Sequence, residues 1–279
     1  MSYPAMRTLV RKAHLQEPSR VRRISWNEHL QAIASQGGIA LYTKNGVVGD
    51  SEESRRKRWQ IWWQSVGRLR KDSVTSARYV RLPKYSEQLA EFAGVMLGDG
   101  GVSKYFVAIS LHSETDKLYA KFVSSLIKNL FGVSPKIYKR LGGKVSDLVV
   151  HRKNLSIFCQ SIGLPLGNKL RGKLDIPDWI KQRCPYAVAC VRGLIDTDGS
   201  VIRHSYTVKG KRYRYKKIAF YSGSNTLLAS IVSILNGLRI AARVDFKAHA
   251  VWIDSKEMTK RYFDMVGSHN PKHLKRYHE

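Results

Sequence analysis

Two matched stretches decide the fold of this chain: FAGVMLGDG at residues 92–100 and VRGLIDTDG at residues 191–199. Two glycines and the final aspartate of the first stretch recur 99 positions later, so Asp99 corresponds to Asp198. Each stretch closes an apolar run with helical spacing and is followed by two strand patterns, a helix, two more strand patterns and a helix. From residue 86 onward, the chain is therefore predicted to hold two copies of one unit, a pseudo-dimer within a single polypeptide.

Small residues line one side of each motif helix at steps of four. They are Ala90, Gly94 and Gly98 in the first helix, and Ala189, Gly193 and Thr197 in the second. Helices with such ridges can approach each other much more closely than helices lined by leucine. We therefore expect the two motif helices to pack against each other and to bring their C-terminal ends together.

Each motif helix ends in an aspartate followed by glycine, which is typical of a helix terminus whose glycine adopts the left-handed cap conformation. The last carbonyl groups of a helix are unpaired and carry the negative end of its dipole, so a carboxylate among them favours a bound cation. Carboxylate and carbonyl oxygens suit Mg²⁺, which can activate water and stabilise the leaving oxygen of a phosphodiester. One Gly-Asp-Gly would be an ordinary turn, whereas two at matched positions favour a metal site.

Composition and charge point to a nucleic-acid partner. The 279 residues include 49 Lys+Arg against 21 Asp+Glu, a formal net charge of +28, and 43% hydrophobic residues allow a folded core. A disordered basic tail is therefore excluded as the whole protein. Basic side chains gain affinity for phosphates by releasing counterions. A membrane surface is disfavoured because the charge is spread along the chain, while a ribosomal or RNA-structural protein would explain the charge but not the paired acids.

Other features bound the chemistry. The sequence has no long apolar stretch or signal-peptide core, and its three cysteines form no C-x-x-C pair. We therefore expect a soluble protein of the cytoplasm, in a prokaryotic-type cytosol or an organelle matrix. Glycine-rich phosphate loops are missing, which disfavours an ATP-driven enzyme. The histidines His269, His273 and His278 have no second ligand pair at a suitable spacing in the sequence, so no zinc site is predicted there.

On these motifs, the sequence resembles the LAGLIDADG homing endonucleases in their single-chain form with two motifs. The resemblance implies an α+β fold of two pseudo-symmetric αββαββα repeats, whose antiparallel four-stranded sheets form a DNA-binding saddle around a central pair of motif helices. We divide the chain into a small basic N-terminal accessory region at residues 1–85, repeat 1 at 86–163, a linker at 164–185 and repeat 2 at 186–279.

The resemblance also implies an activity and a set of ligands. It implies a monomeric, site-specific endonuclease that hydrolyses both strands of a long asymmetric double-stranded DNA target and leaves short 3′ overhangs. Asp99 and Asp198 would be the metal-binding catalytic acids, one for each strand, with the backbone carbonyls of Gly98 and Thr197 as nearby ligands. Mg²⁺ is the expected metal, and Mn²⁺ or Ca²⁺ could replace it in binding. Asp196 has no acidic counterpart in repeat 1 and is expected to be structural.

The chain departs from the family pattern in its accessory catalytic residues. Many relatives place a lysine after the third element of each repeat, where repeat 1 has His112, whose imidazolium could donate to a phosphate. An ordinary strand histidine is an equal alternative. Gly223 of repeat 2 cannot supply a charge, so Lys216 and Lys217 are the candidate substitutes. Because of this departure, an alternative function stays open: the protein could be a non-cleaving descendant of the family, either an intron RNA maturase or a DNA-binding regulator.

Basic and aromatic residues alternate in the strand patterns. Residues 203–217 contain no acid, and Arg212, Arg214 and Lys216 alternate with tyrosines, as in a strand that presents one basic face to the major groove. The expected DNA contacts are Lys104, Lys136, Tyr138, Arg140 and Arg152 in repeat 1, and Arg203, Lys211, Arg212, Arg214 and Lys216 in repeat 2. Because the two halves differ, we expect an asymmetric target.

The N-terminal region contains one clear helical pattern, RRKRWQIWWQSVGRLRK at residues 55–71. Four apolar residues fall on one face of it: Trp59, Trp62, Val66 and Leu69. This helix fits either an element that grips phosphates or a packing helix with solvated basic residues. Turns are expected at Gly37-Gly38 and at Asn45-Gly46.

Overall fold

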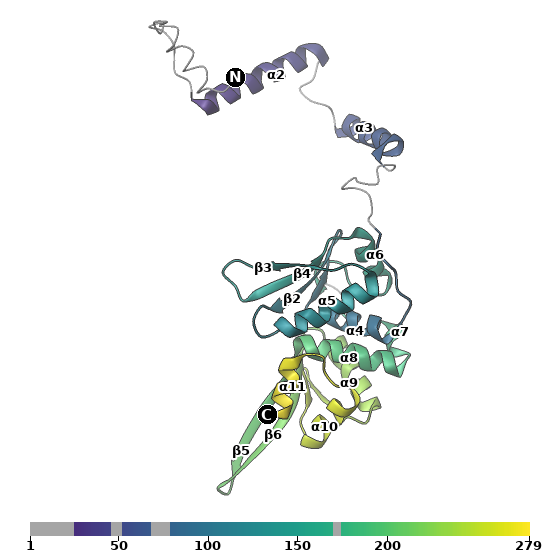
Figure 1. The fold of residues 1–279 in the computed structure, drawn as a ribbon, viewed down its shortest axis with the longest axis vertical. Helices are drawn as coiled ribbons and strands as arrows, with labels where there is room; N and C mark the ends of the chain where they lie inside the picture. Colours follow the sequence, from purple (N-terminus) through teal and green to yellow (C-terminus); the bar gives the residue numbers. More distant parts are fainter. Residues whose placement is uncertain (1–24, 46–51, 68–78, 170–173) are drawn as a thin grey trace. The chain divides into compact units, whose positions relative to one another are not determined.

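The computed structural model describes residues 25–45, 52–67, 79–169 and 174–279 (Figure 1). The chain divides into two compact units, residues 1–76 and residues 77–279. The second unit holds both sequence repeats and all the residues that the sequence assigns to the site.

The described part of the first unit consists of two helices, α2 (Trp26–Asn45) and α3 (Glu52–Ser65). α2 begins with a reciprocal cap: the Ser25 N–H donates to the Glu28 carboxylate at 2.7 Å, and the Glu28 N–H donates to the Ser25 hydroxyl at 3.2 Å. The turn predicted at Gly37-Gly38 is wrong, because both glycines lie inside α2. A helix tolerates each such glycine at a cost of about 1 kcal/mol relative to alanine.

The basic helix α3 begins three residues earlier than predicted and ends at Ser65. Residues 68–71 of the predicted helix, which include Leu69, lie outside the described residues. No residue of α3 is buried, and Trp59 stacks on Trp63 with the ring centroids 5.8 Å apart. In the described residues of this unit, α3 is therefore not packed into a core.

The second unit confirms the predicted element order in both repeats. Repeat 1 contains α4 (Glu87–Leu97), β1 (Gly100–Val102), β2 (Val107–His112), α5 (Lys117–Phe131), β3 (Lys136–Lys139), β4 (Val145–Val150) and α6 (Lys153–Ser161). Repeat 2 contains α8 (Cys184–Asp198), β5 (Gly199–Val208), β6 (Lys211–Tyr221), α9 (Asn225–Gly237), β7 (Arg243–Asp245), β8 (Ala250–Ile253) and α10 (Lys256–Met265). The short helix α7 (Asp178–Lys181) lies between the repeats, and α11 (Pro271–His278) follows the second. No helix among the described residues is long and apolar enough to cross a membrane.

The strands form two four-stranded antiparallel sheets, as predicted. Their orders are β1-β2-β4-β3 and β5-β6-β8-β7, so the second sheet repeats the topology of the first. The registers also correspond, because the pair Ile109↔Leu148 joins the central strands of the first sheet and Phe220↔Val251 those of the second. The fold is therefore α+β with two equivalent halves.

Each sheet has one buried face and one open face. In β2, Val107, Ile109 and Leu111 are buried and alternate with less buried residues, which is the pattern of a strand covered on one side. The buried side contacts α5 in repeat 1, and α9 and α10 contact the sheet of repeat 2. We call the other side of each sheet the open face.

The segment before α4, residues 79–85, belongs to the second unit and packs within it. Val80 is buried, the Arg81 N–H donates to the Phe131 carbonyl at 3.0 Å, and the Tyr85 ring stacks on Trp179 with the centroids 4.3 Å apart. Residues 79–85, which the sequence analysis assigned to the accessory region, thus contact repeat 1 and the linker. The domain limits drawn from the sequence stay a prediction.

The helices α4 and α8 pack backbone against backbone at two reciprocal glycines. A Cβ on Gly94 would overlap the carbonyl oxygen of Cys190, and a Cβ on Gly193 would overlap the carbonyl oxygen of Glu91. Ala90 and Ala189 are fully buried. Because the obstructing atoms are backbone, no rotamer change can make room, and both positions require glycine.

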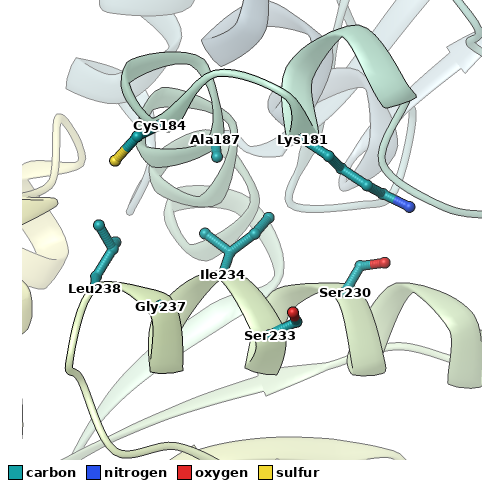
Figure 2. A pocket seen from close by; sticks show the side chains of 8 residues that line it. All are labelled: Lys181, Cys184, Ala187, Ser230, Ser233, Ile234, Gly237 and Leu238. Atoms are coloured by element: carbon teal, nitrogen blue, oxygen red, sulfur yellow. The ribbon is translucent and has the colours of Figure 1, made fainter.

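We predict that Gly94→Ala lowers the free energy of unfolding by roughly 1–3 kcal/mol or more, because the added methyl group overpacks the helix contact. Urea denaturation followed by circular dichroism measures the change. Gly237→Ala is the matched control, since a Cβ there has no neighbour within 4 Å and Gly237 lines an open cavity of about 500 Å³ between α8 and α9 (Figure 2). Equal stability of the Gly94→Ala variant and the wild type would contradict the close packing.

Candidate active site

The C-terminal ends of α4 and α8 meet at Gly98. A Cβ on this residue would overlap the Thr197 hydroxyl and would lie 3.3 Å from the Asp198 carboxylate. Asp99 follows Gly98 directly, and its carbonyl accepts from the Ser110 N–H at 3.1 Å, which anchors it to β2. The two matched aspartates therefore lie together at the junction of the motif helices and the two sheets.

The glycines after the aspartates do not adopt the predicted left-handed conformation. Gly199 is extended, with φ −89° and ψ 168°, and Gly100 is not among the described glycines with positive φ. Glycine is required for another reason: a Cβ on Gly100 would overlap the backbone of Met96, and one on Gly199 would overlap that of Ile195. Each strand thus leaves its helix too tightly for any larger residue.

Burial makes the two carboxylates costly to ionise. The pKa of Asp99 is raised to about 7, first by burial and then by the nearby charge of Asp198, while the ammonium groups of Lys169 and Lys272 act in the opposite direction. Burial also raises the pKa of Asp198, again opposed by Lys169. Two adjacent half-buried acids of this kind form a site that a cation would stabilise.

Lys169 of the linker lies at this site, and the sequence did not single it out. Its ammonium donates to the carbonyls of Leu97 at 3.1 Å and Met96 at 3.3 Å, and also to that of Gly98. Burial lowers the pKa of Lys169, while the charges of Asp198 and Asp99 raise it. The ammonium therefore caps the negative end of the α4 dipole between the two acids.

Lys272 lies on the repeat 2 side of the same region. Its ammonium is paired with the buried Asp116 at 2.8 Å, and its charge lowers the pKa of Asp99. The position is fixed by the neighbouring Asn270, whose amide donates to the Asp196 carbonyl at 2.9 Å. Lysines from the linker and from the C-terminal segment thus approach the aspartates. No sequence motif marks Lys169 or Lys272 as a site residue. The only signal for such residues was that two acids at helix ends require nearby cations.

The accessory residues predicted from the sequence are engaged elsewhere. The His112 Nδ1 accepts from the N–H groups of Glu114 and Thr115, at 3.3 and 3.2 Å, and so caps a turn. The Lys217 ammonium pairs with Asp254 at 2.9 Å, and the Lys216 ammonium donates to a backbone carbonyl of α11. Lys169 supplies the charge near the aspartates instead.

The oxygen atoms at the helix ends fit a hard divalent cation. The two carboxylates and the Gly98 carbonyl form an all-oxygen donor set of the kind that Mg²⁺ prefers. The Gly98 carbonyl accepts from Lys169, so a metal at this oxygen would compete with the ammonium. The Thr197 hydroxyl donates to the carbonyls of Gly193 at 3.0 Å and Leu194 at 2.9 Å, which holds the end of α8 in place.

The predicted DNA contacts of repeat 1 lie mainly on the open face of its sheet. All of β3 is exposed, and Lys136 and Tyr138 share the open face with Asp147 by register. Arg140 is held by Asp147 through contacts of 2.7 and 2.8 Å. The other two predicted contacts, Lys104 and Arg152, lie outside the sheet strands.

The long β5–β6 hairpin of repeat 2 distributes its side chains differently from the expectation. Arg212, Arg214 and Lys216 do alternate with tyrosines, but they share a face with the buried Ile218 rather than the open face. The side chains on the open face of the hairpin, by register with Ala219, are Ile202, His204, Tyr206, Val208, Lys211, Tyr213, Tyr215 and Lys217. Figure 1 shows the hairpin projecting beyond the other strands of its sheet.

The C-terminal segment engages the basic face of this hairpin. Arg203 pairs with Glu279, and the Lys216 ammonium donates to the Tyr277 carbonyl and lies 5.5 Å from the Tyr277 ring centroid. No acid lies within residues 203–217. Glu279, which directly follows α11, is nevertheless the partner of Arg203. The sequence could not show this, because Arg203 and Glu279 are 76 residues apart.

Comparison with known proteins identifies the domain type. Residues 86–163 match the LAGLIDADG-like domain. The chain is 30% identical over 153 residues to the replication factor C small subunit of Methanocaldococcus jannaschii, covering 53% of this chain and 8% of that protein. It is 33% identical over 93 residues to an A-type ATP synthase subunit from Pyrococcus abyssi, covering 33% of this chain and 9% of that protein. The matches thus span less than a tenth of the length of these curated relatives.

Similar solved structures include two homing endonucleases. I-DmoI in complex with DNA and Mn is 20% identical, with 65% of this chain and 96% of that chain covered and a TM-score of 0.44. I-LtrWI bound to target DNA is 15% identical, with coverages of 69% and 88% and a TM-score of 0.48. Full-length DUF199/WhiA from Thermatoga maritima is 14% identical, with coverages of 68% and 59% and a TM-score of 0.43.

The raised pKa of Asp99 predicts a pH dependence of stability in the metal-free protein. The folded state holds a proton up to about pH 7 that the unfolded state releases near pH 3.8, so stability falls as the pH rises through this interval. Asp99→Asn removes this loss. We expect the variant to exceed the wild type in stability above pH 7, on the order of a few kcal/mol, and to equal it below pH 4.

Urea unfolding across this pH range, with a chelator present, measures the difference. Asp178→Asn is the control, because the Asp178 side chain is 89% exposed. A difference between the Asp99→Asn variant and the wild type that does not change with pH would show that Asp99 is not held in the buried position described.

Proposed function

Because residues 86–163 form a LAGLIDADG-like domain and repeat 2 has the same fold, we propose that the protein is a site-specific double-strand DNA endonuclease of the homing type, acting as a monomer. The observation that carries this proposal is the pair Asp99 and Asp198, half-buried together at the ends of two packed helices. A purely structural role would not place two acids at the negative ends of two helix dipoles.

Asp99, Asp198 and the Gly98 carbonyl would hold the divalent metal, with Mg²⁺ as the proposed ion and Mn²⁺ or Ca²⁺ able to bind in its place. Such an ion supplies an activated water and stabilises the leaving oxygen of a phosphodiester. Each aspartate would serve one DNA strand. The ammonium of Lys169 is influenced by the charges of both acids and would stabilise the negative charge that develops on the scissile phosphate.

The open faces of the two sheets would bind the DNA. Exposed lysines and tyrosines on them suit phosphate contacts and base edges, respectively. The hairpin of repeat 2 has strands of 10 and 11 residues, whereas β1 and β2 of repeat 1 have 3 and 6. The two halves would therefore read half-sites of different length and sequence, which gives an asymmetric target. By resemblance to the family, cleavage would leave short 3′ overhangs.

A second candidate function is a non-cleaving descendant, either an intron RNA maturase or a DNA-binding regulator. The observation in its favour is that the predicted accessory lysines of repeat 2 are engaged by other groups, Lys217 by Asp254 and Lys216 by α11. The two aspartates argue against it, because a protein that only binds nucleic acid gains nothing from buried acids near phosphates.

Cleavage of DNA separates the two functions. We expect the purified chain with Mg²⁺ to linearise a plasmid that carries the joined DNA flanks of its own coding sequence. Asp99→Asn or Asp198→Asn should leave the plasmid nicked or uncut, because each variant loses an acid needed for one strand. Asp178→Asn, an exposed linker variant, should cut like the wild type.

Two outcomes would contradict the proposal. If both aspartate variants still cut both strands, these acids are not the catalytic pair. If the wild type binds this DNA tightly in a gel-shift assay but neither nicks nor cuts it with Mg²⁺ or Mn²⁺, the non-cleaving alternative is favoured.

Lys169→Met should lower the rate of DNA cleavage by roughly tenfold to a thousandfold while leaving DNA affinity within about twofold, because the charge acts on the reacting phosphate. Lys169→Arg should restore part of the rate. Single-turnover cleavage measures the effect, with Lys181→Met as the control: Lys181 is also in the linker but pairs with Asp175 at 2.5 Å. An unchanged cleavage rate for Lys169→Met would contradict the proposed role of Lys169 in cleavage.

A further inference from the structure

A second group of potential metal ligands, two buried acids and an exposed histidine, lies away from the paired aspartates. Glu91 of α4, Asp196 of α8 and His269, which precedes α11, each place a ligand atom within 4.8 Å of the others. Glu91 and Asp196 are 4% and 1% exposed. The His269 Nδ1 lies 2.5 Å from the Glu91 carboxylate, and the His269 N–H donates to the Asp196 carboxylate at 2.7 Å.

This cluster is distinct from the candidate active site. On a helix, residues two apart differ by about 200° in direction, so Asp196 and Asp198 project to nearly opposite sides of α8. Glu91 lies two turns before the end of α4, on the stretch that faces α8. The cluster therefore joins the middle of the helix pair to the C-terminal segment, whereas the aspartate site is at the helix ends.

The acids of the cluster are not balanced by the cations beside them. Arg192 contacts both oxygens of Glu91, at 3.3 and 3.4 Å, and its remaining nitrogen donates to the Val266 carbonyl at 3.0 Å. One guanidinium thus faces two buried carboxylates. Asp196 is buried and accepts hydrogen bonds from the Ser268 hydroxyl and the His269 N–H, neither of which neutralises its charge. A buried charge of this kind needs a further partner.

Several polar atoms around the cluster have no hydrogen-bond partner. Both ring nitrogens of His273 are fully buried and unpaired among the described residues, and its Nδ1 lies 3.9 Å from the Asp196 carboxylate. The hydroxyl groups of Tyr119 and Tyr262 are buried and unpaired as well, and the charges of Asp196 and Glu91 act on both. Buried polar groups in folded proteins are normally satisfied, so these unpaired groups are available to a ligand at this position.

We propose that Glu91, Asp196, His269 and His273 bind a structural zinc ion. Two carboxylates and two imidazoles form a donor set that Zn²⁺ accepts, and the spacing His269-x₃-His273 is a common spacing of zinc histidines. Tetrahedral ligands at about 2.0–2.2 Å from the metal lie roughly 3.3 Å from one another, so small side-chain rotations would close the site. The His269 side chain is 42% exposed and provides an entry path.

The zinc ion would fasten the C-terminal segment to the two motif helices. Asp196 thereby has the structural role that the sequence suggested, with a specific partner. The sequence showed no second pair of ligands near His269 and His273. The structure supplies this pair from α4 and α8, and Glu91 lies 178 residues from His269 in the sequence. The Tyr119 and Tyr262 hydroxyls would donate to the ligating carboxylates, as outer partners commonly do in metal sites.

Metal content tests the proposal directly. The full chain is prepared as the Asp99→Asn/Asp198→Asn variant, so that metal at the aspartate site cannot contribute, and its zinc is measured by mass spectrometry after dialysis without chelator. We expect about one zinc per chain. His269→Gln and His273→Gln should each reduce zinc to a small fraction of this value. His278→Gln, on the exposed side of α11, should retain it.

Cobalt substitution gives an independent readout. Co²⁺ in place of zinc should give the strong visible absorption of a tetrahedral site, and His269→Gln should abolish it while the circular dichroism of the chain stays unchanged. Absence of bound zinc and of this absorption in a folded chain would overturn the proposal and assign the unpaired groups to buried water. Retention of zinc in both histidine variants would overturn it too, since the metal would then lie elsewhere.

Discussion

The close contact between α4 and α8 is the constraint on which the rest of the structure depends. Gly94 and Gly193 let the two helix backbones touch, and any side chain there would overlap a carbonyl oxygen. Because α4 and α8 stay in contact up to their C-terminal ends, Asp99 and Asp198 lie next to each other. The two sheets begin immediately after the aspartates, at Gly100 and Gly199, so the helix contact also sets how the halves of the open surface are positioned.

The electrostatics of the site follow from this packing. Two half-buried carboxylates at the negative ends of two helix dipoles are unfavourable unless cations approach them. The chain supplies the ammonium groups of Lys169, from the linker, and Lys272, from the C-terminal segment. The negative charge that they leave unbalanced suits a divalent metal. A chain that carries +28 overall thus concentrates buried acids at its centre and leaves its basic residues toward the surface, where a polyanion can reach them.

The repeated topology could be predicted from the sequence, because helical and strand periodicities are local patterns. The small residues of the motif helices also recur at every fourth position. It was also sufficient to single out Asp99 and Asp198, since both copies carry them. It could not assign Lys169, Glu91 or the partners of Lys216, because these contacts join segments about 60 to 180 residues apart without a local signature. The DNA contacts assigned to the β5–β6 hairpin stay a prediction, because alternation gives two faces but does not say which one the helices cover.

The central claim is that packing of the motif helices creates one shared cation site from the two aspartates. Electron paramagnetic resonance of Mn²⁺ titrated into the wild type and into the Asp99→Asn and Asp198→Asn variants tests it most directly, since free and bound Mn²⁺ differ in signal. Our account predicts that loss of either aspartate weakens binding at least about tenfold, the loss of one charged ligand of a hard cation. Binding as tight in both variants as in the wild type would contradict it.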